Sequence, residues 1–217
     1  MSLSTAGQSM NRRQSGIGAY QTITHRVITR SIMAYTSSTE IKSCRAELDS
    51  HADTCGVNDV ALVIEYLGKV AEVNGFSKSM TALQDIPIVK AGLAYDDPRT
   101  GETIVLIVNQ ALYFGSNLAH VLLNQNQMRT HGLIVDDCPK HLSKNRTSTH
   151  SIMAEEHNLT IPLKLNGIIS YFDVRTPTLE EINNCQHIEI TSSEVEWEPY
   201  STQFAENETM IESKIMP

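Results

Sequence analysis

The feature that most constrains this chain is a series of short apolar segments, rich in β-branched residues and separated by turn-forming residues. Each segment is too short for a stable helix, and β-branched side chains favour a pleated, half-buried strand. The sequence therefore predicts a protein that is mainly β. The predicted strands are residues 61–66, 69–73, 86–92 and 103–108.

Turn-forming residues indicate how these strands connect. Asn74-Gly75 tolerates the positive φ angles of a two-residue type I′ turn, so it predicts a hairpin between two of the strands. Residues 96–101, rich in Asp, Pro and Gly, predict a second turn. Residues 117–131 have apolar side chains at helical spacing and precede Gly132, so part of this segment is expected to be one short helix, with or without a strand before it.

A second module is expected after a polar connector. Residues 159–165 and 168–174 flank Asn166-Gly167, the strongest hairpin signal in the chain, and Thr178 and Glu181 have the spacing of a helix capping box. Residues 189–212 contain seven Glu and no Lys or Arg, which predicts a solvated tail. The expected organisation is a flexible leader (1–44), a β domain (45–139), a linker (140–150), a small β-hairpin and helix module (151–188) and an acidic tail (189–217).

Composition excludes several classes of function. The net charge of −8 argues against binding by broad phosphate neutralisation, so no direct nucleic-acid binding is expected from the core. No apolar run approaches the roughly 20 residues that span a bilayer, and the four scattered cysteines do not suggest a disulfide scaffold. A cytoplasmic or nuclear protein without a membrane partner is expected. The acid-free, Arg-bearing residues 1–39 leave mitochondrial targeting open.

Residues 47–55, with the sequence ELDSHADTC, contain the strongest functional signal. Peptide hydrolysis by carboxylates requires two of them close enough to share one proton, so that one activates water while the other protonates the carbonyl. Such a carboxylate follows an apolar strand, a hydroxyl residue then braces the loop, and a small residue lets the backbone approach the substrate. Asp49 and Ser50 occupy the first two of these positions.

This stretch resembles the active-site motif of the retropepsin family, in particular the aspartic proteases of copia-type retrotransposon (Gag-Pol) polyproteins. The resemblance covers residues 45–139 and implies a closed β barrel with one short helix. It also implies that Asp49 is the catalytic carboxylate. The supporting-loop and substrate-binding residues that it implies are Ser50, His51, Ala52 and Asp53.

Two further segments continue the resemblance. The family places a flap hairpin, which closes over substrate, where this chain has Asn74, Gly75 and Phe76. Residues 119–132 resemble the second apolar motif and closing helix of the family. The chain departs from the family pattern at His51 and at Asn124, because Gly is usual at both positions.

A single motif of this kind implies a homodimer, in which each copy supplies one Asp49 across a symmetric interface. Asp96-Asp97 and Asp136-Asp137 lack the flanking pattern and are expected in turns. The resemblance therefore implies a homodimeric endopeptidase of retroelement origin that cleaves a polyprotein, with water as the nucleophile and with no cofactor or metal.

Two other functions stay open. A catalytically inactive descendant would use the β barrel as a binding or assembly module, and Asp49-Ser50 would then be an ordinary strand-end turn. Alternatively, Asp49, His51, Asp53 and Cys55 alternate, so on an extended strand they would share one face and could bind zinc. Their spacing matches no standard zinc motif.

Overall fold

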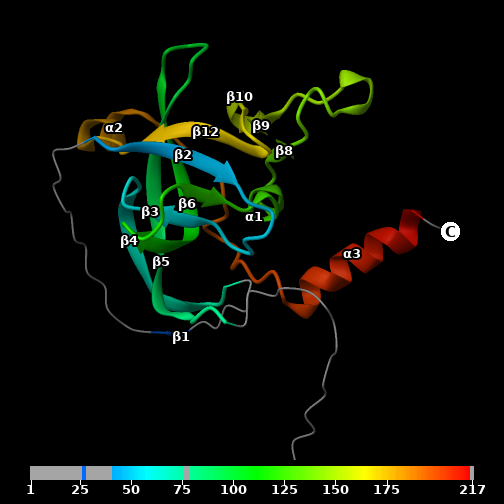
Figure 1. The fold of residues 1–217 in the computed structure, drawn as a ribbon, viewed down its shortest axis with the longest axis horizontal. Coiled ribbons are helices and arrows are strands. Elements are labelled where there is room, and N and C mark those ends of the chain that lie inside the picture. Colours follow the sequence, from blue (N-terminus) through cyan, green and yellow to red (C-terminus); the bar gives the residue numbers. More distant parts are fainter. Residues whose placement is uncertain (1–25, 28–40, 76–78, 216–217) are drawn as a thin grey trace, which may run out of the picture.

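The computed structural model describes residues 26–27, 41–75 and 79–215, and the chain is mainly β (Figure 1). Ten strands belong to one mixed sheet. They are β1 (Arg26–Val27), β2 (Ser43–Leu48), β3 (Gly56–Asn58), β4 (Leu62–Val73), β5 (Leu83–Asp96), β6 (Thr103–Gly115), β7 (Val121–Leu123), β11 (Lys164–Asn166), β12 (Ile169–Arg175) and β13 (Gln186–Glu189). Their order is β1-β4-β5-β12-β2-β7-β3-β6-β13, with β11 paired to β12 and a further pairing between β5 and β6.

The predicted strands appear within three long antiparallel strands, β4, β5 and β6. The predicted strands 61–66 and 69–73 are two parts of the single strand β4. Gly68 lies between them with φ of +69°, and the β4–β5 register shifts between Tyr66 and Val70. Because glycine adopts positive φ without steric cost, the bulge bends the strand and does not end it.

The turn predicted at Asn74-Gly75 is wrong. Val73 of β4 pairs with Leu83 of β5, so the two strands are joined by residues 74–82 and not by a two-residue turn. Gly75 does not have a positive φ, which a type I′ turn requires. Phe76 lies outside the described residues.

The segment 117–131 contains a strand and then a helix, as one of the two expectations had it. β7 lies between β2, to which it is parallel, and β3, to which it is antiparallel. Helix α1 (Gln125–Thr130) follows after Asn124, and Gly132 beyond its end has φ of +94°. This left-handed conformation explains why glycine ends the helical segment.

A separate three-stranded sheet follows α1. It contains β8 (Ile134–Asp136), β9 (Ser151–Ala154) and β10 (Leu159–Pro162) in the order β10-β9-β8, with the short 3₁₀ helices η1 (Lys144–Arg146) and η2 (Glu155–His157) in its connections. Pro162 lies in an edge strand, where its missing N–H leaves no ladder bond unmade. The predicted strand 159–165 is therefore divided between β10 here and β11 in the large sheet.

The expected hairpin is present, but its turn lies one residue later than Asn166-Gly167. β11 and β12 are antiparallel and Asn166 pairs with Ile169, so the turn consists of Gly167, with φ of +62°, and Ile168. However, residues 151–188 are not an appendix to the β domain. β12 pairs along its length with β2, and the two strands lie side by side in Figure 1. Phe172 and Val174 of β12 are buried in the main core, and Phe172 contacts Tyr95 edge-on. Burial of this face joins the two predicted units into one core.

The acidic tail also begins later than the sequence suggested. Helix α2 (Leu179–Asn184) has the predicted capping box between Thr178 and Glu181, and β13 then pairs with β6 in parallel. Ile190 and Trp197 are 2% and 8% exposed, so the chain stays packed beyond residue 189. Helix α3 (Thr202–Ile215), which follows this packed segment, points away from the sheet (Figure 1). No helix among the described residues has both the length and the apolar character to span a membrane.

Candidate functional site

Asp49 directly follows β2, at the point where β2 runs beside β7. Its backbone N–H donates to the carbonyl of Leu123, the last residue of β7, with an N···O distance of 3.0 Å. The end of one strand is thereby fixed against the end of its parallel neighbour. Asp49 is half-buried, so its carboxylate lies at the boundary between the core and solvent.

The Asp49 carboxylate organises the loop that follows it. Its Oδ1 accepts the backbone N–H of His51 at 2.8 Å and that of Ala52 at 3.3 Å. Both Ser50 and His51 are exposed, and neither has a role in the core. His51 has no positive φ, so its position does not need the glycine that the retropepsin pattern would place there.

Asn124 braces the same loop from the opposite side. Its side-chain amide donates to the Ala52 carbonyl at 2.5 Å, and its Oδ1 accepts the Gln127 N–H at 2.6 Å as the N-cap of α1. Its φ of −76° is ordinary extended backbone. The departure from glycine at Asn124 therefore supplies a strut between the Asp49 loop and α1, without backbone strain.

Cys55 ends the loop inside the core. Its backbone N–H donates to Gln127 Oε1 at 2.8 Å, and its sulfur accepts the Asn124 N–H at 3.2 Å. Burial raises the pKa of the Cys55 thiol to about 12, so the group stays protonated at neutral pH. A thiolate is required for metal binding, so Cys55 is poorly suited as a ligand.

The zinc interpretation also assumed an extended strand between Asp49 and Cys55, and this assumption is wrong. The segment is a loop with bends, Cys55 is buried, and His51 is exposed, so the four side chains do not share one face. Among the described residues, no group of three or more His, Cys, Asp or Glu side chains could hold a metal ion.

A cavity of about 190 Å³ lies beside the loop. Leu67, Ile88 and Leu112 form its apolar wall from β4, β5 and β6, while Thr54 contributes the loop side. The remaining wall comes from the C-terminal segment 192–197, which we call the strap. The strap residues that line the cavity are Ser193, Glu194, Glu196 and Trp197, and they face Lys69 and Gln110.

Trp197 attaches the strap directly to the loop. Its indole N–H donates to the Asp53 carbonyl at 2.7 Å, and its backbone N–H donates to Gln110 Oε1 at 2.8 Å. Asp53, one of the supporting-loop and substrate-binding residues that the resemblance implies, is half-buried. The loop that carries Asp49 is thus bounded by Asn124 on one side and by Trp197 on another.

A polar cluster lies on β2 before the loop. Arg45 forms an ion pair with Glu47 at 2.9 Å and a hydrogen bond with His120 Nε2 at 2.8 Å, and its guanidinium lies over the ring of Tyr171 at 5.3 Å from the centroid. Because arginine only donates, His120 Nε2 accepts this bond. The Arg45 guanidinium thereby supplies a counter-charge to the buried Glu47 carboxylate, and the cluster links β2 to β12.

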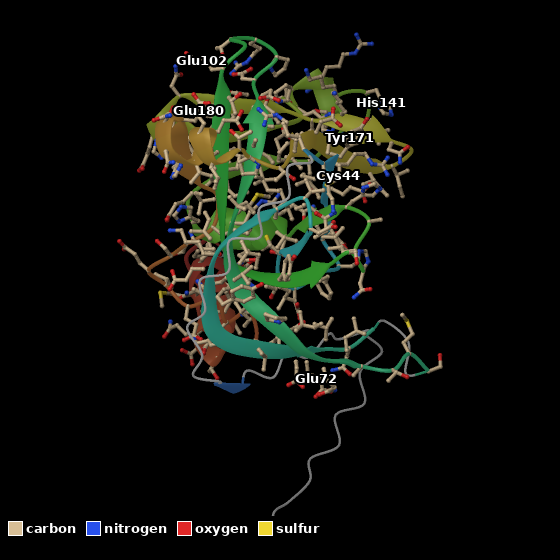
Figure 2. The ribbon with its side chains drawn as sticks, turned by 90° about the vertical axis from the view of Figure 1, so that its left-hand side faces the viewer. Cys44, Glu72, Glu102, His141, Tyr171 and Glu180 are labelled. Atoms are coloured by element: carbon tan, nitrogen blue, oxygen red, sulfur yellow. The ribbon has the colours of Figure 1, made fainter. Side chains whose placement is uncertain are left out.

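The other acidic pairs lie at strand ends and not wholly in turns, because Asp96 is the last residue of β5 and Asp136 the last residue of β8. Asp97 accepts the backbone N–H and the guanidinium of Arg99, and Asp136 accepts the N–H and hydroxyl of Thr149. Figure 2 shows that the β5–β6 turn, marked by Glu102, lies at the opposite end of the molecule from Glu72 of β4. The paired ends of β4 and β5 extend past the body near Glu72 (Figure 2).

Sequence reasoning missed several residues of this site. Asn124 had been recognised only as a departure from a family pattern, although Asn followed by a helical segment is itself an N-cap signal. Gln127, Gln110 and Trp197 gave no local signal, because their contacts with the loop or with the strap span large separations in sequence. Ser50 was expected to brace the loop, whereas the bracing bonds are those of Asn124.

Comparison with protein-family models, with curated proteins and with solved structures finds no match to this chain.

Proposed function

We propose that this chain is an aspartic endopeptidase of retroelement origin, with a retropepsin-like closed barrel, that acts as a homodimer on a polyprotein. The observation that carries the proposal is the position of Asp49. A carboxylate that is half-buried, fixed at the end of β2 by a bond to Leu123 and held by two backbone N–H groups is oriented for general acid–base chemistry.

The strand pairings support the proposed closed barrel. The hydrogen-bonded neighbours pass from β5 through β12, β2, β7 and β3 to β6, and β6 pairs again with β5. The pairing between β5 and β12 is short, at Arg175 and Ala94. A closed ring leaves no free edge between these strands and would fix the Asp49 loop on a rigid body.

The β4–β5 hairpin is the proposed flap. Its ladder extends from Leu62 and Gly92 to Val73 and Leu83, and its distal part extends past the body of the molecule. Asn74 and Gly75 follow the end of β4 and would contribute backbone contacts to a bound peptide. An extended peptide would lie between this hairpin and the Asp49 loop.

The proposed homodimer supplies the second carboxylate. Two carboxylates close together share one proton, which gives one base and one acid at the same pH. The exposed tip at Ser50 and His51 leaves the Asp49 loop accessible to the same loop of a second copy. Ser50, His51, Ala52 and Asp53 would then lie at the two-fold axis or along the peptide.

The test is cleavage of a peptide library by the purified chain at several pH values. We expect cleavage that is blocked by a statine-type inhibitor, unaffected by a chelator and abolished by Asp49→Asn. Asp173→Asn is the matched control, because Asp173 is exposed and forms a surface pair with Lys164 that contributes about 0–1 kcal/mol.

The alternative, a catalytically inactive dimeric module, makes the opposite prediction. If the wild type and Asp49→Asn are equally silent while both remain folded and dimeric, the protease proposal is wrong and the chain is a binding or assembly module. Cleavage that survives in Asp49→Asn and is lost with chelator would instead identify a metal-dependent contaminant or site.

A further inference from the structure

The strap is held against the large sheet by polar contacts with one residue of β6. Gln110 donates its side-chain amide to the carbonyls of Ser192 and Val195 at 2.9 and 2.8 Å, and its Oε1 accepts the Trp197 N–H at 2.8 Å. The strap is therefore bound to the sheet through its main chain. It is a bent segment, in which Ser192 Oγ accepts the N–H groups of Glu194 and Val195.

Two side chains of the strap add specificity. Glu196 forms an ion pair with Lys69 of β4, and Trp197 is 8% exposed, with its indole bonded to Asp53 in the proposed catalytic loop. The strap thus bridges the two elements between which a substrate peptide is proposed to lie, the flap strand and the loop. An aromatic ring with one satisfied polar group is a typical anchor at a binding surface.

The space beneath the strap is only partly filled. The cavity of about 190 Å³ has Leu67, Ile88 and Leu112 on one side and the strap on the other. A second cavity of about 70 Å³ lies between the strap and α1, lined in part by Gln127 and Thr130. Loose packing on both sides favours local release of this segment over release of the core strands.

We propose that the strap is an internal ligand of the peptide-binding cleft, so that the cleft accepts a peptide in trans only when residues 192–197 leave it. The class of peptide is the one that the strap itself represents, with an acidic residue to pair with Lys69 followed by a bulky aromatic residue beside Asp53. The identification of the cleft as peptide-binding rests on the proposed function. A tethered ligand of this kind competes at an effective concentration in the millimolar range.

The single tryptophan of the chain makes displacement directly measurable, since all tryptophan emission comes from Trp197. The probe is the Trp-free peptide Ser-Ser-Glu-Val-Glu-Phe, added at up to millimolar concentration to full-length Asp49→Asn protein so that no cleavage occurs. We expect a saturable shift of Trp197 emission to longer wavelength, because the indole moves from a buried site into water.

Two variants test the contacts that hold the strap. Gln110→Gly removes all three bonds to it and suits the φ of +54° at this position. We expect red-shifted emission without peptide and probe binding about tenfold tighter, because the open fraction rises. Trp197→Ala, followed by calorimetry, should tighten binding similarly. Ile211→Ala, at an exposed position of α3, is the matched control and should match the parent protein.

Several results would overturn the proposal. They are absence of probe binding to every variant, binding without any change in Trp197 emission, and parent-like emission and affinity in Gln110→Gly. The two proposals fail separately. If the wild type cleaves a polyprotein and Gln110→Gly has no effect, the strap proposal is wrong and the protease proposal stands. If the probe displaces the strap but no chain that contains Asp49 cleaves a substrate, the protease proposal is wrong and the strap proposal stands.

Discussion

The side chain of Asn124 connects the start of α1 to the carbonyl of Ala52, which lies 72 residues earlier in the chain. One amide group therefore caps a helix with its oxygen and closes the Asp49 loop with its nitrogen. Both groups are largely removed from water, since Asn124 is 4% exposed. The loop that carries the candidate catalytic carboxylate depends on this single side chain as well as on the bonds made by Asp49.

Asn124→Ala should lower the free energy of unfolding by about 1–3 kcal/mol, because it removes the N-cap and leaves the Ala52 carbonyl without this donor. Asn124→Asp keeps the cap acceptor and loses the donor, so it should fall between the wild type and the alanine variant. Urea denaturation measures both. An alanine variant with wild-type stability would show that the loop does not depend on this bond.

Cys55 and Cys138 should differ strongly in their reactivity with iodoacetamide at pH 8. Cys55 is fully buried and burial raises its pKa to about 12, whereas Cys138 is exposed. Because the thiolate is the nucleophile, native protein should be alkylated at Cys138 and spared at Cys55. Peptide mass spectrometry identifies the modified site, and denatured protein, in which both react, is the control. Rapid native labelling of Cys55 would contradict the buried loop.

The ion pair between Arg175 and Glu181 should make stability fall at acidic pH. The Arg175 guanidinium lowers the pKa of Glu181 from 4.5 to about 2. A depressed carboxyl pKa stabilises the fold above about pH 4.5, and this contribution, on the order of 2–3 kcal/mol, is lost as pH falls toward 2. Glu181→Gln retains the capping acceptor and should have a flatter stability profile from pH 4.5 to 2. Parallel profiles in thermal unfolding would contradict this assignment.

His150 should add a second pH dependence at higher pH. It is 6% exposed, its Nε2 lies 2.9 Å from Ser170 Oγ, and burial lowers its pKa below 6.5. The unfolded chain then binds the proton more readily, so stability is complete above about pH 6.5 and declines as pH falls toward the lower folded-state pKa. His150→Asn, which tolerates the φ of +47° here, should reduce that decline. Denaturant midpoints at pH 5 and 7.5 provide the comparison.

Local features of the fold could be predicted from the sequence, because they depend on neighbours within a few residues. The hairpin between β11 and β12 and the Thr178–Glu181 capping box are of this kind, although the hairpin turn lies one residue later than predicted. The β character of residues 61–108 likewise follows from short β-branched segments. Asn74-Gly75 carried the same signal as Asn166-Gly167, but the register of β4 and β5 pairs Val73 with Leu83 and leaves residues 74–82 between the two strands, too many for a two-residue turn.

Features that depend on distant partners were not predictable. Nothing local in β12 indicates that it pairs with β2, so the hairpin module seemed independent. Trp197 was assigned to a solvated tail because seven glutamates dominate residues 189–212, yet its ring is buried against the Asp49 loop. Within the site, Asp49 was identifiable from its own motif, whereas the residues that position its loop were not.

The pairing of β2 with β12 also has a consequence for the order in which the chain can fold. Glu47 pairs with Tyr171, so more than half of the 217 residues separate the two partners. Contacts this distant in sequence form late, because a long loop must first close. During synthesis, the strand that precedes Asp49 gains this neighbour only after β12 has left the ribosome. A nascent chain that stops before residue 169 should therefore lack the neighbour that fixes β2, so the candidate site is incomplete until most of the chain has been made.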